Sequence, residues 1–191
     1  MGNRDLQMKK MNVLIACEFS GKIREAFVQK GHNAWSCDLI PSEISGQHIQ
    51  GDVLDIINND WDLMIAHPPC TFLAVSGARW FEYRQKQQKE ALRFVKQLLQ
   101  AHIRKICIEN PVSIISTKIR KPDQIIQPWM FGHGETKATC LWLKNLPLLT
   151  PTNIVKGREH KIHKMPPSRN RGKLRSITYQ GIADAMAEQW G

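Results

Sequence analysis

The stretch MNVLIACEFSGKIREAF, residues 11–27, decides the fold. Its first half is a short apolar run that ends in polar residues and a glycine, which is typical of a buried parallel strand. Its second half places Ile23, Ala26 and Phe27 on one helical face, and Gly31 follows as a stop signal. A strand, a turn of small residues and a helix in this order predict the first unit of an α/β sheet.

The rest of the chain repeats this alternation. We predict strands at 11–17, 34–39, within 48–56, and at 61–69, 105–111 and 138–143, and helices at 21–30, 82–102 and 182–189. The pattern predicts one domain over residues 1–191, an α/β, doubly wound domain with a mainly parallel sheet. Such sheets bind ligands beyond the carboxyl ends of their strands. Five polar residues fall at these ends: Glu18, Asp38, Asp52, Cys70 and Glu109.

Composition narrows the class of protein. No run of 18 apolar residues is present, so no membrane span is expected. The first ten residues carry no apolar segment of the signal-peptide type, which predicts an intracellular, cytoplasmic protein. The five cysteines are an odd number and none forms a CxxC pair, so neither a disulfide framework nor a metal site is expected.

The formal net charge of +10 points to a polyanionic partner. Eight of the cations lie between positions 156 and 175, a segment that contains one acidic residue and that we call the basic segment. Its prolines and glycines predict a loop rather than a helix. A basic loop beside a compact domain favours contact with a nucleic-acid backbone, and a solvated tail is the alternative.

The turn after the first strand and the two aspartates favour a nucleoside-type cofactor. A small-residue turn lets a ligand approach the backbone at a helix N-terminus, although a lone Gly21 makes neither a Walker loop nor a dinucleotide fingerprint. Asp38 ends the second strand, where a carboxylate commonly accepts hydrogen bonds from ribose hydroxyls. Asp52 would hold an adenine amino group or its own turn. Each aspartate alone is also typical of turn chemistry.

Cys70 follows two prolines at the end of the fourth strand. A core thiol is the common role of a lone cysteine. A deaminase-type zinc site is excluded, because the second cysteine of PCxxC is absent. Glu109 ends the fifth strand, which should neighbour the fourth, so both side chains would face one crevice. A thiolate beside a carboxylic acid suggests attack on an electron-poor ring.

These residues resemble the cytosine-5 DNA methyltransferase family, over roughly residues 11–146 and 176–190. The matching motifs are Phe19-Ser20-Gly21, Asp38, Gly51-Asp52, Pro68-Pro69-Cys70, Glu109-Asn110 and Thr178-Tyr179-Gln180-Gly181-Ile182. The pair of Pro-Pro-Cys and Glu-Asn, in the family's order, is the most specific part.

Four departures from the family pattern are present. Lys22-Ile23 stands where the first motif has a second glycine, and Pro111 stands where valine is usual. Lys137 replaces an arginine of the catalytic loop. The large target-recognition domain is missing, and residues 144–176 stand in its place as a reduced, basic DNA-contact segment. This reduction is typical of a small, phage-like form.

The resemblance implies a Rossmann-like fold that uses S-adenosylmethionine, with DNA as partner and a monomer as the favoured state. It implies that a flipped-out cytosine is methylated at carbon 5 through a covalent adduct with the cysteine. The implied catalytic residues are Cys70, Glu109, Asn110 and Lys137. The implied cofactor-binding residues are Phe19, Ser20, Gly21, Asp38, Asp52, Pro68, Gln180 and Gly181. The DNA-binding candidates are Arg79, Lys156, Arg158, Lys161, Lys164, Arg169, Arg171, Lys173 and Arg175.

Three alternatives remain open at the level of sequence. The amino-methyltransferases carry an acidic residue or asparagine, two prolines and an aromatic residue at this strand end, and His67-Pro68-Pro69-Cys70 is close to that pattern. An enzyme acting on a free nucleotide is the second alternative. A catalytically inactive DNA-binding module that kept the fold is the third.

Overall fold

The computed structural model describes residues 9–191. A seven-stranded sheet has the order β3-β2-β1-β4-β5-β7-β6. The strands β1 to β5 run parallel, and β6 and β7 are antiparallel additions at one edge. Their bounds are β1 Asn12–Ala16, β2 Asn33–Asp38, β3 His48–Gln50, β4 Leu63–Ala66, β5 Lys105–Pro111, β6 Gln124–Ile126 and β7 Thr139–Lys144. The predicted α/β domain with a mainly parallel sheet is confirmed.

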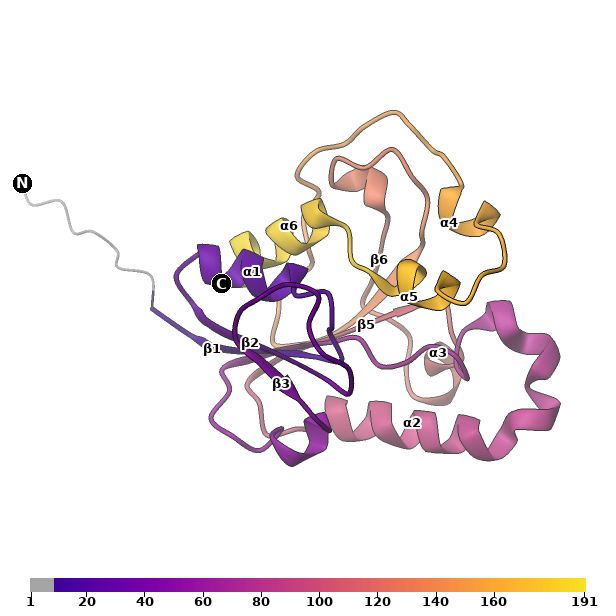
Figure 1. Cartoon of the computed structure of the whole chain (residues 1–191), viewed down its shortest axis with the longest axis horizontal. Coiled ribbons are helices and arrows are strands. Elements are labelled where there is room, and N and C mark those ends of the chain that lie inside the picture. The colour runs from indigo at the N-terminus through magenta and orange to yellow at the C-terminus, as the bar shows by residue number, and fades with distance from the viewer. Residues whose placement is uncertain (1–8) are drawn as a thin grey trace, which may run out of the picture.

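Helices cover both faces of the sheet (Figure 1). On one face, α1 and α6 pack their apolar sides together over the central strands, and the other face is covered mainly by α2. The α-helices are α1 Lys22–Gln29, α2 Gln85–Leu99, α3 Ile115–Lys118, α4 Lys161–Lys164, α5 Arg171–Ser176 and α6 Gln180–Trp190. Short 3₁₀ helices span Val53–Asp55, Val75–Trp80, Glu82–Arg84 and Pro128–Met130.

The central parallel strands β1 and β4 are buried on both faces, which is why they read as continuous apolar runs. All four residues of β4 are buried, as are the last four of β1. The chain leaves β1 toward β2 and β3, and then crosses back to β4 and β5. This reversal makes the carboxyl ends of β1 and β4 the topological switch point, where doubly wound sheets bind their ligands.

The structure corrects several boundaries. The helix predicted over 82–102 is α2 preceded by 3₁₀ turns, and the last helix begins at Gln180 rather than at 182. The prediction of a loop for the basic segment is wrong in part, because α4 and α5 lie within it. The short α4 fits between Gly157 and Pro166, and α5 begins after the prolines and contains Gly172. The strand β6 and the helix α3 were not predicted.

Within residues 9–191, no helix has the length and apolar character needed to cross a bilayer.

Candidate functional site

The predicted polar residues gather at the carboxyl edge of the parallel strands, around the switch point. Ala16 of β1 pairs with Ala66 of β4, and Ala66 pairs with Ile108 of β5. The residues that follow these three positions therefore lie at one level of the sheet, where β1 and β4 end while β5 continues to Pro111. Two cavities open there, and Pro69 contributes to the walls of both.

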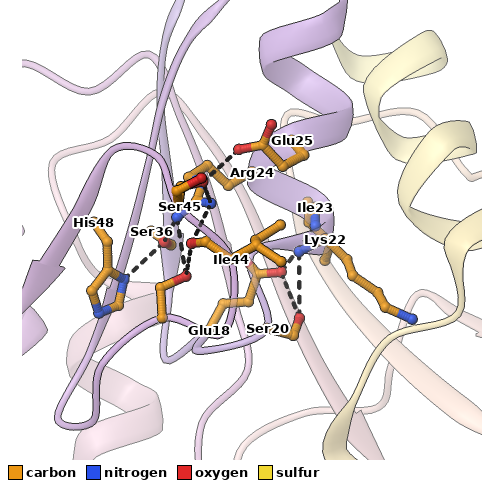
Figure 2. A network of polar contacts seen from close by, with 11 residues as sticks. Glu18, Ser20, Lys22, Ile23, Arg24, Glu25, Ser36, Ile44, Ser45 and His48 are labelled. Carbon is orange, nitrogen blue, oxygen red and sulfur yellow. Dashed lines mark hydrogen bonds and ion pairs between the residues drawn. The ribbon is translucent and has the colours of Figure 1, made fainter.

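The turn after β1 is held by a buried carboxylate (Figure 2). Glu18 Oε1 accepts hydrogen bonds from the backbone N–H of Ile23, at 2.9 Å, and from Ser20 Oγ, at 3.1 Å. A carboxylate at this place satisfies a free N–H in the first turn of α1 and complements the helix dipole. Gly21 has a φ of +72°, and a Cβ there would lie 2.5 Å from Ile44 Cγ1. The turn therefore requires glycine.

Arg24 is fully buried beside this turn and was missed by sequence reasoning. Its guanidinium donates to the carbonyls of Ile44 and Ser45, at 3.2 and 2.8 Å, and to Ser36 Oγ, at 3.1 Å. It also contacts Glu25 Oε1 at 3.0 Å (Figure 2). These bonds fix the loop between β2 and β3 against α1. The burial of Arg24 could have been predicted from its position, because residue 24 lies three residues before Phe27 and therefore on the inward side of the helix.

The first cavity, which we call the Asp38 cavity, has a volume of about 390 Å³. Asp38 Oδ1 accepts from the backbone N–H of Ile40 at 3.2 Å. Asp52 caps the following 3₁₀ helix by accepting from the N–H of Leu54 at 3.0 Å. Most of the remaining wall is apolar and includes Val53, Pro69, Phe72, Ala91 and Phe94. With Glu90, the cavity therefore combines three carboxylates with flat apolar surfaces.

The other predicted cofactor residues lie outside this cavity. Phe19, Ser20 and Gly21 form the turn into α1, and the ammonium of Lys173 lies 4.9 Å from the ring centre of Phe19. Pro68 lines the second cavity instead.

Gln180 and Gly181 open α6 and make contacts within the fold. Gln180 Nε2 donates to Asp184 Oδ1 at 2.8 Å, and the backbone N–H of Gly181 donates to His133 Nε2 at 3.0 Å. A Cβ on Gly181 would lie 1.9 Å from the carbonyl oxygen of Phe131. The glycine therefore allows α6 to approach the 131–133 segment.

The second cavity, which we call the Cys70 cavity, has a volume of about 320 Å³ and brings together all four predicted catalytic residues. Asn110 is buried, and its Nδ2 donates to the carbonyl of Pro68 at 2.8 Å, which ties β5 to the Pro-Pro turn. Arg175 and His163, from α5 and α4, complete the wall. The basic segment therefore forms part of this cavity.

Glu109 contacts a residue that was not predicted as functional. His67 Nδ1 lies 2.9 Å from Glu109 Oε2, and the two side chains are only 10% and 12% exposed. Burial alone would raise the pKa of Glu109, but the hydrogen bond and charge of His67, with the charge of Lys137, hold that pKa below its usual value. The register of β4 and β5 indicates this contact, because the pairing of Ala66 with Ile108 places residue 67 beside residue 109.

Burial and the charged groups around Cys70 have opposing effects on the pKa of its thiol. Burial raises the pKa of Cys70, the charge of Glu109 raises it further, and Lys137 and Arg175 act to lower it. Burial lowers the pKa of Lys137, whose Nζ donates to the carbonyl of Ile177 at 3.3 Å. Two cations thus stand beside the cysteine that lines this cavity.

Of the nine DNA-binding candidates, Arg175 lies in the wall of the Cys70 cavity, and the other eight fall into two groups. Several are held by the protein itself: Lys173 pairs with Glu43, Lys161 pairs with Glu159, Arg158 stacks on Trp129, Arg171 donates to the carbonyl of Met165, and Arg79 lies over the ring of Trp80. Lys156, Lys164 and Arg169 are exposed and make no ion pair within the part of the chain that the structure describes. The exposed trio is therefore the best placed for phosphate contact.

No protein-family model matches the chain, and no curated protein matches it either. The residues of the Asp38 cavity and the Cys70 cavity are therefore the basis for the function.

Proposed function

We propose that the protein transfers a methyl group from S-adenosylmethionine to carbon 5 of cytosine in DNA. One observation carries the proposal. Cys70 and Glu109 both line the Cys70 cavity. Pro69 lies in its wall and also in the wall of the Asp38 cavity, which is large enough for a nucleoside. The reaction needs a thiol nucleophile, a carboxyl group and room for the cofactor at one strand edge, and the two neighbouring cavities support the proposal.

The residues of the Asp38 cavity fit the nucleoside half of S-adenosylmethionine. Asp38 Oδ2 makes no hydrogen bond to any of residues 9–191, so it is available to accept from ribose hydroxyls. Phe72 and Phe94 offer apolar surface for an adenine ring. When bound, the cofactor supplies an electrophilic methyl group.

Cys70 acts as the nucleophile in this proposal. Its thiolate forms a bond to carbon 6 of the flipped-out base, and the electrons of the ring move toward nitrogen 3. A base that fills the cavity excludes water from Glu109 and favours its neutral form, which donates a proton to nitrogen 3 and so stabilises the charge that develops there. Carbon 5, now nucleophilic, is methylated. A water molecule removes the proton from carbon 5, the carbon 5–carbon 6 double bond re-forms as the thiolate leaves, and nitrogen 3 returns its proton to Glu109.

Lys137 and Asn110 support these two groups. Lys137 stabilises the Cys70 thiolate and the Glu109 carboxylate through its charge. Asn110 fixes the Pro-Pro turn that presents the thiol. The exposed cations of the basic segment contact the phosphate backbone, and we propose a DNA partner on that basis.

The test is methyl transfer to mixed-sequence duplex DNA, with wild type beside Cys70→Ser. Digested nucleosides are identified by mass spectrometry. We expect 5-methylcytosine from the wild type and none from the variant. Methyl on an exocyclic amine that survives the substitution would support the amino-methyltransferases instead. DNA binding without any methyl product would support an inactive module.

A further inference from the structure

His67 makes a short, buried contact with the proposed acid, and no motif of the resemblance includes it. It follows β4 directly, and its backbone N–H donates to the carbonyl of Ala16 at 2.9 Å. Its imidazole Nδ1 lies 2.9 Å from Glu109 Oε2. The side chain is nine-tenths buried, so the contact is shielded from bulk water.

The groups around His67 indicate which of the two residues donates the hydrogen bond between His67 and Glu109. A carboxylate oxygen can only accept a hydrogen bond, so in the 2.9 Å contact Nδ1–H of His67 donates to Oε2. His67 Nε2 is buried and has no hydrogen-bond partner among residues 9–191. The ring therefore carries a proton on Nδ1, where Oε2 accepts it, rather than on Nε2 alone.

We propose that His67 is a positioning residue that decides which oxygen of Glu109 carries the acid proton. Because Oε2 accepts Nδ1–H from His67, the proton of the neutral acid is confined to Oε1. Oε1 is then the oxygen that Glu109 offers to the Cys70 cavity, where nitrogen 3 of the base requires a donor. The inference rests on the proposed function, since it names how that acid is oriented.

Other groups around Glu109 have smaller effects on its pKa than the hydrogen bond from His67. Lys137, which precedes β7, lowers that pKa through its charge, and Thr139 of β7 lowers it further by hydrogen bonding. Arg175 of α5 is a cation near the thiol. Cys70 and His163 complete the titratable groups of the cavity wall. His67 is therefore the group whose removal should change the charge of Glu109 most.

The reactivity of Cys70 reports the charge of Glu109 without any methyl transfer. The three variants are His67→Asn, which keeps an N–H donor near the position of Nδ1, His67→Phe, which removes it, and Glu109→Gln, which removes the charge. The initial rate of carbamidomethylation by iodoacetamide is measured from pH 5 to pH 10, and Cys70 is followed by peptide mass spectrometry. Circular dichroism confirms that each variant is folded.

We expect the Cys70 profile of His67→Phe to shift to lower pH, like that of Glu109→Gln. Without His67, burial keeps Glu109 protonated, and its charge no longer raises the pKa of the thiol. If the midpoint falls by one pH unit, the thiolate fraction below it rises about tenfold. His67→Asn should match the wild type. An unshifted His67→Phe profile, or an equal shift in His67→Asn, would overturn the proposal.

A second measurement uses the unmodified protein. Nitrogen-15 spectra of labelled histidine distinguish an Nδ1–H ring from an Nε2–H ring and from an imidazolium. We expect a proton on Nδ1 at pH 7.5, and a ring protonated on Nε2 alone would contradict the proposal. Neither experiment depends on methyl transfer, so they can succeed even if the wild type forms no 5-methylcytosine. In that case the proposed function fails and the His67–Glu109 assignment stands.

Discussion

At the scale of single residues, the site is a balance of buried charges around one thiol. Cys70 is made less acidic by burial and by Glu109, while Lys137 and Arg175 offset part of that effect. The resemblance suggested Cys70 as the proposed nucleophile and Glu109 as the proposed acid. His67 and Arg24 could not be found from motifs, because their importance comes from which side chains the fold brings to them.

Lys137→Gln should make Cys70 less reactive. The ammonium lowers the pKa of the thiol, so removing it raises that pKa and leaves less thiolate at a given pH. We expect the pH profile of Cys70 alkylation to shift to higher pH, the opposite direction from Glu109→Gln. The matched control is Lys121→Gln on the exposed surface, which should leave the profile unchanged.

Arg24→Met should destabilise the protein by about 3 kcal/mol, because it leaves buried carbonyl and hydroxyl acceptors without donors. The free energy of unfolding is measured by urea titration. Arg93→Met, on the exposed side of α2, is the control and should change the stability by less than about 0.5 kcal/mol. Equal effects in the two variants would show that the buried network contributes no stability.

At the scale of elements, the parallel core was predictable and its surroundings were not. The apolar runs of β1, β4 and β5 predicted strands because burial on both faces leaves little room for polar residues. The helices α4 and α5 were missed because Pro166, Pro167 and Gly172 suggested a loop. Gly181 was assigned to a cofactor motif, but its place in α6 gives it a packing role.

Gly181→Ala should destabilise the protein by about 3 kcal/mol, since the new Cβ would overlap the carbonyl oxygen of Phe131 and force α6 to move. Gly172→Ala is the matched control. It lies in α5 with open space around its Cα, so alanine should be neutral or add up to about 1 kcal/mol through its helix propensity. Thermal unfolding of both variants checks the prediction, which fails if Gly181→Ala melts at the wild-type temperature.

At the scale of the whole molecule, charge is distributed unevenly. The carboxyl edge of the sheet carries both cavities and the basic segment, and α4 and α5 lie near the end of β5 (Figure 1). Such an arrangement places exposed cations at the opening through which a flipped base would enter. The sequence predicted the charge cluster, but only the fold places Arg175 in the wall of the cavity.

Replacing Lys156, Lys164 and Arg169 together by glutamine should weaken DNA binding and its salt dependence. If each cation contacts one phosphate, the slope of log K against log salt falls by up to about 2.7. Fluorescence anisotropy with labelled duplex measures the slope. The control replaces Lys96, Arg104 and Lys121, which are exposed away from the cavities. A slope that changes equally in both triple variants would exclude the basic segment as the binding surface.

The central claim is that Cys70 forms a covalent bond with cytosine, and trapping that bond tests it most directly. The protein is incubated with S-adenosylmethionine and duplex DNA in which 5-fluorocytosine replaces cytosine, because fluorine blocks loss of the carbon 5 substituent and holds the adduct. Peptide mass spectrometry then maps the linked residue. We predict a nucleotide adduct on Cys70 that is absent in Cys70→Ser. Unmodified Cys70, in a preparation that transfers methyl to DNA, would contradict the account.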